Sequence, residues 1–156
     1  LRSGTGTTFT DDEKKMVSTM SDLIIPRTDT PGAVDAGVPE FIVMMMQECY
    51  PDKDQATFHN GLAAFDKQCR KQYGGSFSGL SPEKQQKAVS DLDTQVLSDK
   101  KSDVGDLAFY RKLKELTLLG YFTSEPGATK ALRYVQIPGR YDGDVPYHKG
   151  DKAWAT

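Results

Sequence analysis

The chain has 156 residues, of which 37% are hydrophobic, 27% charged and 10% aromatic, and this composition is typical of one ordinary globular domain. A formal net charge of −2 and a pI near 5.7 leave no basic field for phosphates and argue against nucleic-acid binding. The longest apolar run, residues 41–46, is far shorter than the roughly 18 residues that a membrane-spanning helix needs. We therefore expect no direct membrane span.

The chain divides into three segments by composition. Residues 1–9 are rich in Gly and Thr, and we expect them to form a flexible lead-in after a missing leader. Residues 10–120 are predicted to form a helical domain. Residues 121–156 are predicted to form a C-terminal strap or tail that belongs to the same domain.

The first predicted helix begins at Thr10, because Thr10 and Glu13 have the spacing of a capping box. Pro26 ends this helix, since proline disfavours helical geometry in the residue before it. Between these two signals, apolar residues recur at helical spacing and predict one buried face: Met16, Val17, Met20, Leu23 and Ile24.

The loop that follows contains the sequence PRTDTPG and has two interpretations. In the first, Asp29 caps its own backbone, Pro31 stiffens the turn and Gly32 permits an unusual backbone angle. In the second, the loop presents Thr28, Asp29 and Thr30 to a partner or to a small ligand. Loop chemistry favours the first interpretation.

A second and a third helix are predicted to form a hairpin. The second carries Pro39 in its first turn and ends before Pro51. Asp52 together with Gln55 is expected to cap the third helix, which stops at Gly74. Their apolar positions recur at helical spacing: Val38, Phe41, Ile42, Met45, Met46 and Cys49 in the second, and Phe58, Leu62, Phe65 and Cys69 in the third.

Two more helices complete the predicted bundle. One begins with Ser81 as its cap and Pro82 in its first turn, and the other follows the polar stretch 98–106. The inward positions of the last helix are Phe109, Tyr110, Leu113, Leu116 and Gly120. No long β-branched alternation competes with this pattern, so the predicted fold class is all-α, a compact bundle of about five helices.

Cysteine and histidine, which commonly form disulfides, metal sites or catalytic sites, are sparse in this sequence. Cys49 and Cys69 are predicted about 22 Å apart along the hairpin, too far for a disulfide, so we expect two free, buried thiols. His59 and His148 have no metal-ligand partner at i+3 or i+4, and we expect surface residues. We therefore predict no catalytic, cofactor-binding or metal-ligating residue in this chain.

From residue 121 onward the chain becomes rich in proline, glycine and spaced aromatic residues, and only residues 129–135 are expected to form a short helix. Irregular segments of this length are commonly functional. Spaced rings suit an extended strap that docks either on its own bundle or on a partner. The rings are Tyr121, Phe122, Tyr134, Tyr141, Tyr147 and Trp154.

Five segments of the chain, in order, resemble the gluconate 2-dehydrogenase subunit 3 family. They are DLIIPRTDTPGAVDAGVPEFI (22–42), GLAAFD (61–66), GLSPEKQ (79–85), FYRKLKELTLLGYFTSEPGA (109–128) and YVQIPGRYDG (134–143). The resemblance runs from Thr10 to about Gly143, which is nearly the whole chain.

This resemblance implies a non-catalytic small subunit of a bacterial periplasmic sugar or glycoside dehydrogenase. In such complexes FAD sits in a large subunit of the glucose-methanol-choline (GMC) oxidoreductase type, and haem c in a cytochrome c subunit. The small subunit supports export, maturation and stability of the flavoprotein, and its precursor carries a twin-arginine leader. We expect the contact with the large subunit at Thr28, Asp29, Thr30, Tyr121, Phe122, Tyr134, Tyr141, Tyr147 and Trp154.

Two rival classes remain open. A free-standing periplasmic helical protein could hold a small ligand between the loop 26–37 and the tail, which requires a concave pocket of several hundred cubic ångströms. An enzyme in its own right would need His59, His148 or the carboxylates to be brought together by folding.

Overall fold

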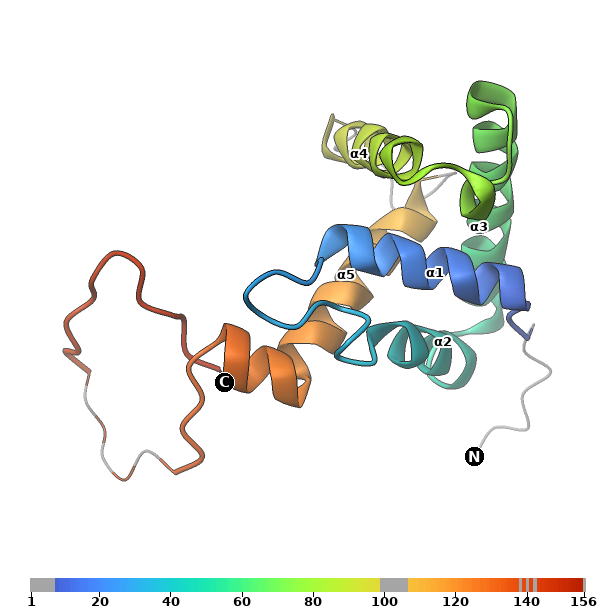
Figure 1. The fold of residues 1–156 in the computed structure, drawn as a ribbon. Coiled ribbons are helices and arrows are strands. Elements are labelled where there is room, and N and C mark those ends of the chain that lie inside the picture. Colours follow the sequence, from blue (N-terminus) through green and yellow to red (C-terminus); the bar gives the residue numbers. More distant parts are fainter. Residues whose placement is uncertain (1–7, 99–106, 138, 140, 142, 156) are drawn as a thin grey trace.

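The computed structural model describes residues 8–98, 107–137, 139, 141 and 143–155, and their regular structure is helical, as predicted (Figure 1). Five α-helices form the bundle, with a 3₁₀ turn η1 after α3 and a π-helical turn η2 after α5. The elements are α1 (Asp11–Ile24), α2 (Val38–Glu48), α3 (Asp52–Tyr73), η1 (Phe77–Gly79), α4 (Pro82–Ser98), α5 (Ala108–Thr123) and η2 (Gly127–Ala131).

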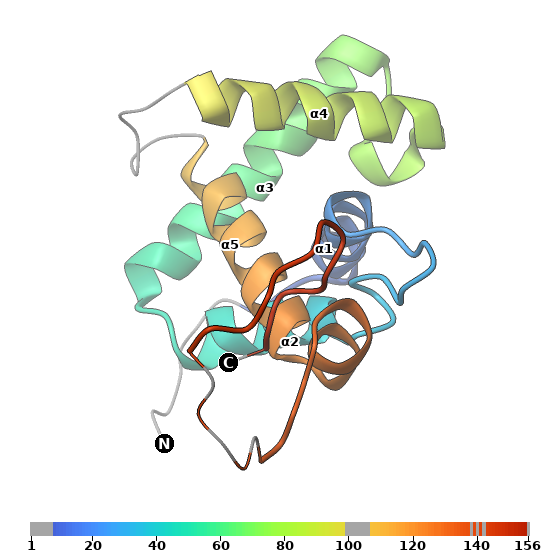
Figure 2. The ribbon, with the colours of Figure 1, turned by 90° about the vertical axis from the view of Figure 1, so that its left-hand side faces the viewer.

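Helix α5 is the centre of the bundle, because it packs against α1, α2, α3, α4 and η2 (Figure 2). Two glycines let its neighbours approach closely. A Cβ atom on Gly61 of α3 would lie 2.5 Å from the side chain of Phe109, and a Cβ on Gly120 of α5 would lie 2.6 Å from the ring of Phe41 on α2. The inward residues predicted for the last helix do lie in the core, among them Leu113 and Leu116 at 0% exposure.

The helix ends confirm most of the predicted signals. Thr10 forms the complete capping box with Glu13, and Gly74 ends α3 in the left-handed conformation. The prediction that Asp52 and Gln55 cap α3 is wrong, because the N-cap is Pro51. Gln55 instead donates from Nε2 to the carbonyls of Gln47 (3.3 Å) and Tyr50 (3.0 Å), so it closes the end of α2 across the short turn.

Both cysteines are free, as predicted, but only one of them is buried. Cys69 is 1% exposed, and burial, with a contribution from the nearby Asp66 carboxylate, raises its pKa to about 11. Cys49 is exposed, so its predicted burial is wrong. It is the C-cap of α2, where the chain turns away and the helical periodicity that predicted burial no longer applies.

Candidate partner-binding surface

Helix α5 continues to Thr123 and is followed by the π-helical turn η2, which lies earlier than the short helix predicted at 129–135. The turn packs directly on the end of α5, and Gly127 makes this possible. A Cβ atom at Gly127 would lie 1.8 Å from the carbonyl oxygen of Tyr121, so no other residue fits there without displacing backbone. The turn fixes where the C-terminal segment leaves the bundle.

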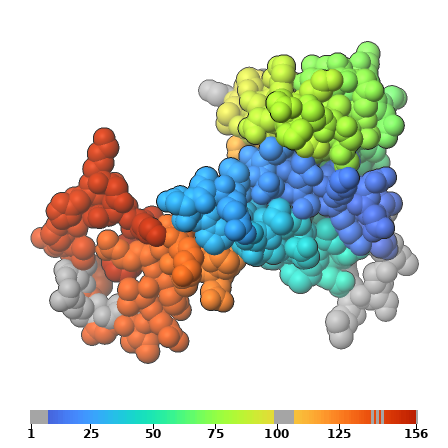
Figure 3. All heavy atoms as spheres, viewed as in Figure 1, coloured from blue at the N-terminus to red at the C-terminus, as the bar shows by residue number. Residues whose placement is uncertain are grey.

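The described residues between 133 and 155, here called the arm, form a loop whose two ends meet (Figure 1). The amide of Arg133 donates to the carbonyl of Ala153 at 2.8 Å, and the amide of Ala155 donates to the carbonyl of Arg133 at 2.9 Å. The Arg133 guanidinium lies 4.7 Å from the centre of the Trp154 ring, a cation–π contact. We call these contacts the clasp. Figure 3 shows the arm projecting beyond the helices.

The arm is almost wholly exposed. Every described residue from 134 to 150 is exposed, with Tyr141 at 98% and Tyr147 at 77%. The alternative in which the tail docks on its own bundle therefore does not hold for the described residues. Trp154 and Tyr134, also predicted contact residues, are 50% and 53% exposed.

The exposed apolar residues gather at this end of the molecule. Among the described residues, ten of the thirteen large exposed hydrophobics lie on the arm or on the last turns of α5, and we call this set the C-terminal surface. Its members are Leu118, Leu119, Phe122, Tyr134, Val135, Ile137, Tyr141, Val145, Tyr147 and Trp154. Large exposed apolar patches on soluble proteins are commonly interaction sites, so this surface is the candidate site.

Tyr121 and Phe122, adjacent in sequence, have different environments. Phe122 is 41% exposed and belongs to the C-terminal surface. Tyr121 is 2% exposed, so its ring belongs to the core and cannot contact a partner as predicted. Its hydroxyl donates to the carbonyl of Pro31 at 2.6 Å and ties the loop 26–37 to α5. Neighbouring helix positions point about 100° apart, which separates the two roles.

The loop 26–37 is organised by Arg27 and Asp35, which the sequence interpretation missed. Arg27 donates from Nε to Asp35 at 2.8 Å and pairs with it through a second nitrogen. The amide of Gly32 also donates to Asp35 at 2.8 Å. The bonds from Arg27 and then from Gly32 hold the pKa of Asp35 below its ordinary value of 3.8. A Cβ atom on Gly32 would lie 2.6 Å from the backbone nitrogen of Arg27, so the turn requires glycine there.

Asp29, which was expected to cap this loop, accepts a hydrogen bond from the Thr28 hydroxyl at 2.9 Å. Thr28 and Asp29 are exposed and Thr30 is half-buried. Asp35 makes the backbone bond expected of Asp29, because the chain folds back and brings residue 35 onto residues 27 and 32. The exposed tip remains open to a partner, as the second interpretation requires.

His59 is 9% exposed, so its predicted surface position is wrong. Its Nδ1 lies 2.7 Å from Oε1 of Glu13, and its ring packs 4.4 Å from that of Phe9. Burial disfavours ionisation of Glu13, but the hydrogen bonds from His59 and Thr10 outweigh it and hold the pKa of Glu13 below its ordinary value of 4.5. His59 therefore joins α3 to the start of α1, whereas His148 lies on the exposed arm.

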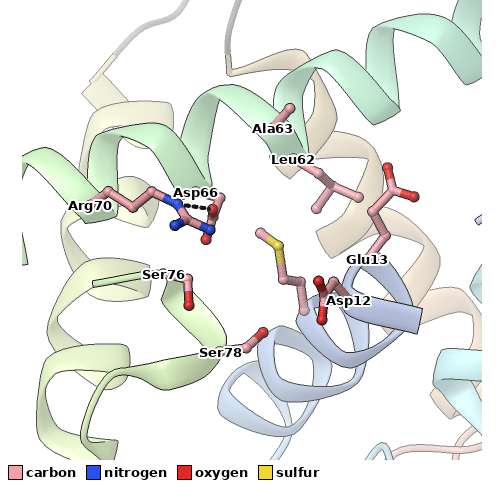
Figure 4. A pocket seen from close by; sticks show the side chains of 9 residues that line it. Asp12, Glu13, Leu62, Ala63, Asp66, Arg70, Ser76 and Ser78 are labelled. Atoms are coloured by element: carbon pink, nitrogen blue, oxygen red, sulfur yellow. Dashed lines mark hydrogen bonds and ion pairs between the residues drawn. The ribbon is translucent and has the colours of Figure 1, made fainter. Parts of the chain in front are cut away.

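A hollow of about 190 Å³ lies between α1, α3 and η1, and Asp66 and Arg70 help to line it (Figure 4). One oxygen of Asp66 accepts from the amide of Phe77 at 2.8 Å, and the other accepts from Nε of Arg70 at 2.8 Å. The first bond holds η1 against α3, and the second lies within α3. These bonds have a structural role, and we assign no ligand to this hollow.

A second hollow of about 580 Å³ lies between α1 and α2, with Lys14 and Lys15 on one side and Glu40, Val43 and Met44 on the other. Neither hollow is lined by the loop 26–37 or by the arm, the two segments that the ligand-binding alternative named. Within the described part of the chain, no group of three or more His, Cys, Asp or Glu residues is placed to hold a metal ion. The same residues contain no helix long and apolar enough to cross a bilayer.

The family model described as gluconate 2-dehydrogenase subunit 3 matches residues 11–139. The match includes every helix of the bundle and the first part of the arm, and it ends within the arm. No curated protein and no solved structure matches the chain. Since the matched residues make up most of the chain and coincide with its folded body, the chain belongs to the gluconate 2-dehydrogenase subunit 3 family.

Proposed function

We propose that this chain is the non-catalytic small subunit of a bacterial periplasmic FAD-dependent sugar or glycoside dehydrogenase. It binds a GMC-type flavoprotein large subunit and supports the export, maturation and stability of that subunit. Membership of the family supports association with a dehydrogenase. The observation that carries the proposal is the C-terminal surface, where most of the large exposed apolar residues are concentrated.

The chemistry of this surface suits a protein partner. Tyrosine and tryptophan bury a large area with few rotatable bonds, and aromatic residues are enriched at protein interfaces. Leu118 and Phe122, one turn apart on α5, provide an apolar ridge beside the arm, and the exposed tip at Thr28 and Asp29 provides polar contacts for a rim. An apolar centre with a polar rim is the usual anatomy of an interface.

We assign FAD to the large subunit and haem c to a third, cytochrome c subunit. The roles of the acidic and histidine side chains in the helical body support this division, because they are used to hold elements together. Glu13 and His59 join α1 to α3, and Asp66 holds η1 on α3. We place the complex in the periplasm and assign its export to the twin-arginine route.

Co-expression with a candidate GMC-type flavoprotein from the same genome tests the proposal. The chain should elute with the flavin absorbance in size-exclusion chromatography, and sugar oxidation with an artificial electron acceptor should require its presence during expression. Separate elution together with activity that is indifferent to the chain would refute the subunit role. The hollow of about 580 Å³ between α1 and α2, which neither the loop 26–37 nor the arm lines, would then be the first place to look for a bound small molecule, since its volume suits one.

A matched pair of variants locates the contact. Phe122→Glu places a charge on the C-terminal surface and should abolish co-elution. Leu97→Glu places the same charge on α4, at a side chain that is even more exposed (69% against 41%), and should leave co-elution unchanged. Equal behaviour of the two variants would place the contact elsewhere on the chain.

A further inference from the structure

We propose that the arm is a preformed docking loop, closed by the clasp between Arg133 and Trp154, that recognises an apolar surface on the large subunit. The inference rests on the proposed function and adds how the chain binds and what the partner surface must look like. In this arrangement Arg133 and Trp154 are positioning residues, and the tyrosines between them make the contact.

Contacts at the root of the arm close it in the free chain. The two backbone hydrogen bonds between Arg133 and residues 153 and 155 form a parallel bridge. The guanidinium of Arg133 lies over the Trp154 ring, and the ammonium of Lys152 bonds to the carbonyl of Lys130 in η2. Only near this root are arm residues partly buried, whereas the described residues from 134 to 150 are exposed.

A turn at residues 148–151 leads the last part of the arm into the clasp. The amide of His148 donates to the Asp151 carboxylate at 2.8 Å, and the amide of Asp151 donates to the carbonyl of His148 at 3.0 Å. Gly150 has a φ of 102°, a conformation that favours glycine. Tyr147 stands immediately before this turn, so the turn sets the position of its exposed ring.

Closure matters because of conformational entropy. An open segment of this length would have to become ordered when it binds, and that loss would weaken the affinity. The clasp brings the two ends of the arm together during folding, before the partner arrives. A residue that touches the partner would instead contribute through the area that it buries in the complex. A double-mutant cycle distinguishes these two roles.

The composition of the arm indicates the chemistry of the partner surface. Residues 133–155 contain four Lys and Arg against three Asp and Glu, so the arm carries almost no net charge. Its exposed side chains include Tyr134, Ile137, Tyr141 and Tyr147. Aromatic residues are enriched at the centre of protein interfaces. The matching surface of the large subunit therefore has an apolar centre that receives the tyrosine rings.

The clasp can be tested in the chain alone, because Trp154 is its single tryptophan. Arg133→Ala should free the ring and raise the acrylamide quenching constant of its fluorescence about twofold, since the cation–π contact is lost. Arg133→Lys should restore part of the protection. Quenching that is the same in Arg133→Ala and in the natural sequence would show that the clasp does not form, and would overturn the inference.

The role of the clasp in binding is tested by a double-mutant cycle with the purified large subunit. Arg133→Ala and Trp154→Ala should each weaken the Kd about three- to tenfold, and the double variant should be no weaker than the worse single one, because both open the same loop. Tyr141→Ala should weaken binding about tenfold as a contact residue. Single effects that multiply in the double variant would make Arg133 and Trp154 independent contacts and overturn the inference.

Two further outcomes separate this inference from the proposed function. If the natural chain binds the large subunit and every arm variant binds equally well, the inference fails while the subunit role stands. If the natural chain does not bind at all, the proposed function fails and the inference with it. Leu97→Ala on α4 is the control and should bind like the natural sequence.

Discussion

The helical body and the arm use the same residue types in opposite ways. In the body, seven aromatic rings are at most 5% exposed: Phe9, Phe58, Phe65, Phe77, Phe109, Tyr110 and Tyr121. In the arm, Tyr134, Tyr141, Tyr147 and Trp154 are all at least 50% exposed. The fold does not depend on the rings of the arm. The two regions should therefore respond differently to substitution.

The buried rings form a continuous chain through the body. Phe9 contacts Phe58 (5.9 Å between centroids), Phe58 contacts Phe109 (6.4 Å), Phe109 contacts Phe65 (6.1 Å) and Phe65 contacts Phe77 (5.2 Å). The start of the described chain, α3, η1 and α5 are thus held by one aromatic cluster. Such pairs add stability beyond the area they bury.

The largest difference should come from truncating one side chain in each region. Leu113→Ala leaves a cavity at the centre of the bundle and should lower the free energy of unfolding by about 2–5 kcal/mol. Tyr141→Ala in the arm should change it by less than about 0.5 kcal/mol. Urea unfolding followed by circular dichroism measures both. A destabilised Tyr141→Ala variant would show that the arm contributes to the stability of the fold, and would contradict the contrast between the helical body and the arm.

A glycine pair tests how tightly the body is packed. Gly61→Ala places a methyl group 2.5 Å from Phe109, and should lower the free energy of unfolding by about 1–3 kcal/mol through overpacking. Gly75→Ala is the control, because its nearest neighbour is Leu80 at an ordinary 3.6 Å, and its melting temperature should be nearly unchanged. If both variants have the same melting temperature as the natural sequence, α3 and α5 are less closely packed than the structure shows.

The bonds between Glu13 and His59 should make part of the body's stability depend on pH. Because folding lowers the pKa of Glu13 from 4.5, its contribution is complete above that value and is lost as the pH falls through the lowered pKa. Glu13→Gln should therefore cost about 1–2 kcal/mol at pH 7 and progressively less below about pH 4.5. Glu40→Gln controls for the loss of a charge in the first turn of a helix. A cost that stays constant down to pH 3 would mean that the charge of Glu13 is not its source.

The smallest effect should come from removing one hydroxyl group. Tyr121→Phe loses the 2.6 Å hydrogen bond to Pro31 and should lower the free energy of unfolding by about 1 kcal/mol, while hydrogen exchange in the loop 26–37 becomes faster. Tyr147→Phe, whose ring is 77% exposed, should alter neither quantity. Unchanged exchange in Tyr121→Phe would show that the loop is held by Arg27 and Asp35 alone.

Much of the fold was predictable because its signals are local. The capping box at Thr10, the stop at Gly74 and the inward positions of α5 depend on residues within a few positions of one another. The predictions that proved wrong concern side chains whose partners are distant in the chain. Gln55 was paired with its own helix although it caps the preceding one, and His59 was placed at the surface although Glu13, 46 positions away, lies beside it.

The candidate site was predictable only in part. Spacing of aromatic residues indicated an extended strap but left open whether it docks on its own bundle or on a partner, and only the structure shows that Tyr134, Tyr141 and Tyr147 are exposed. The same pattern could not separate Tyr121 from Phe122, because adjacent aromatic residues on a helix look alike until the neighbouring loop is placed. Nor could it reveal the clasp, because Arg133 and Trp154 are far apart in the chain and pair through an isolated bridge, which no periodicity in the sequence predicts.

The sequence by itself therefore determined the helical class, the approximate helix boundaries, the family and the aromatic character of the C-terminal segment. Short-range capping, periodicity and composition are enough for these features. Only the tertiary structure decided which rings are buried, that Arg27 and Asp35 organise the loop, and that the arm closes on itself. Each of these depends on contacts between residues far apart in the chain, and such contacts exist only once the helices have packed around α5.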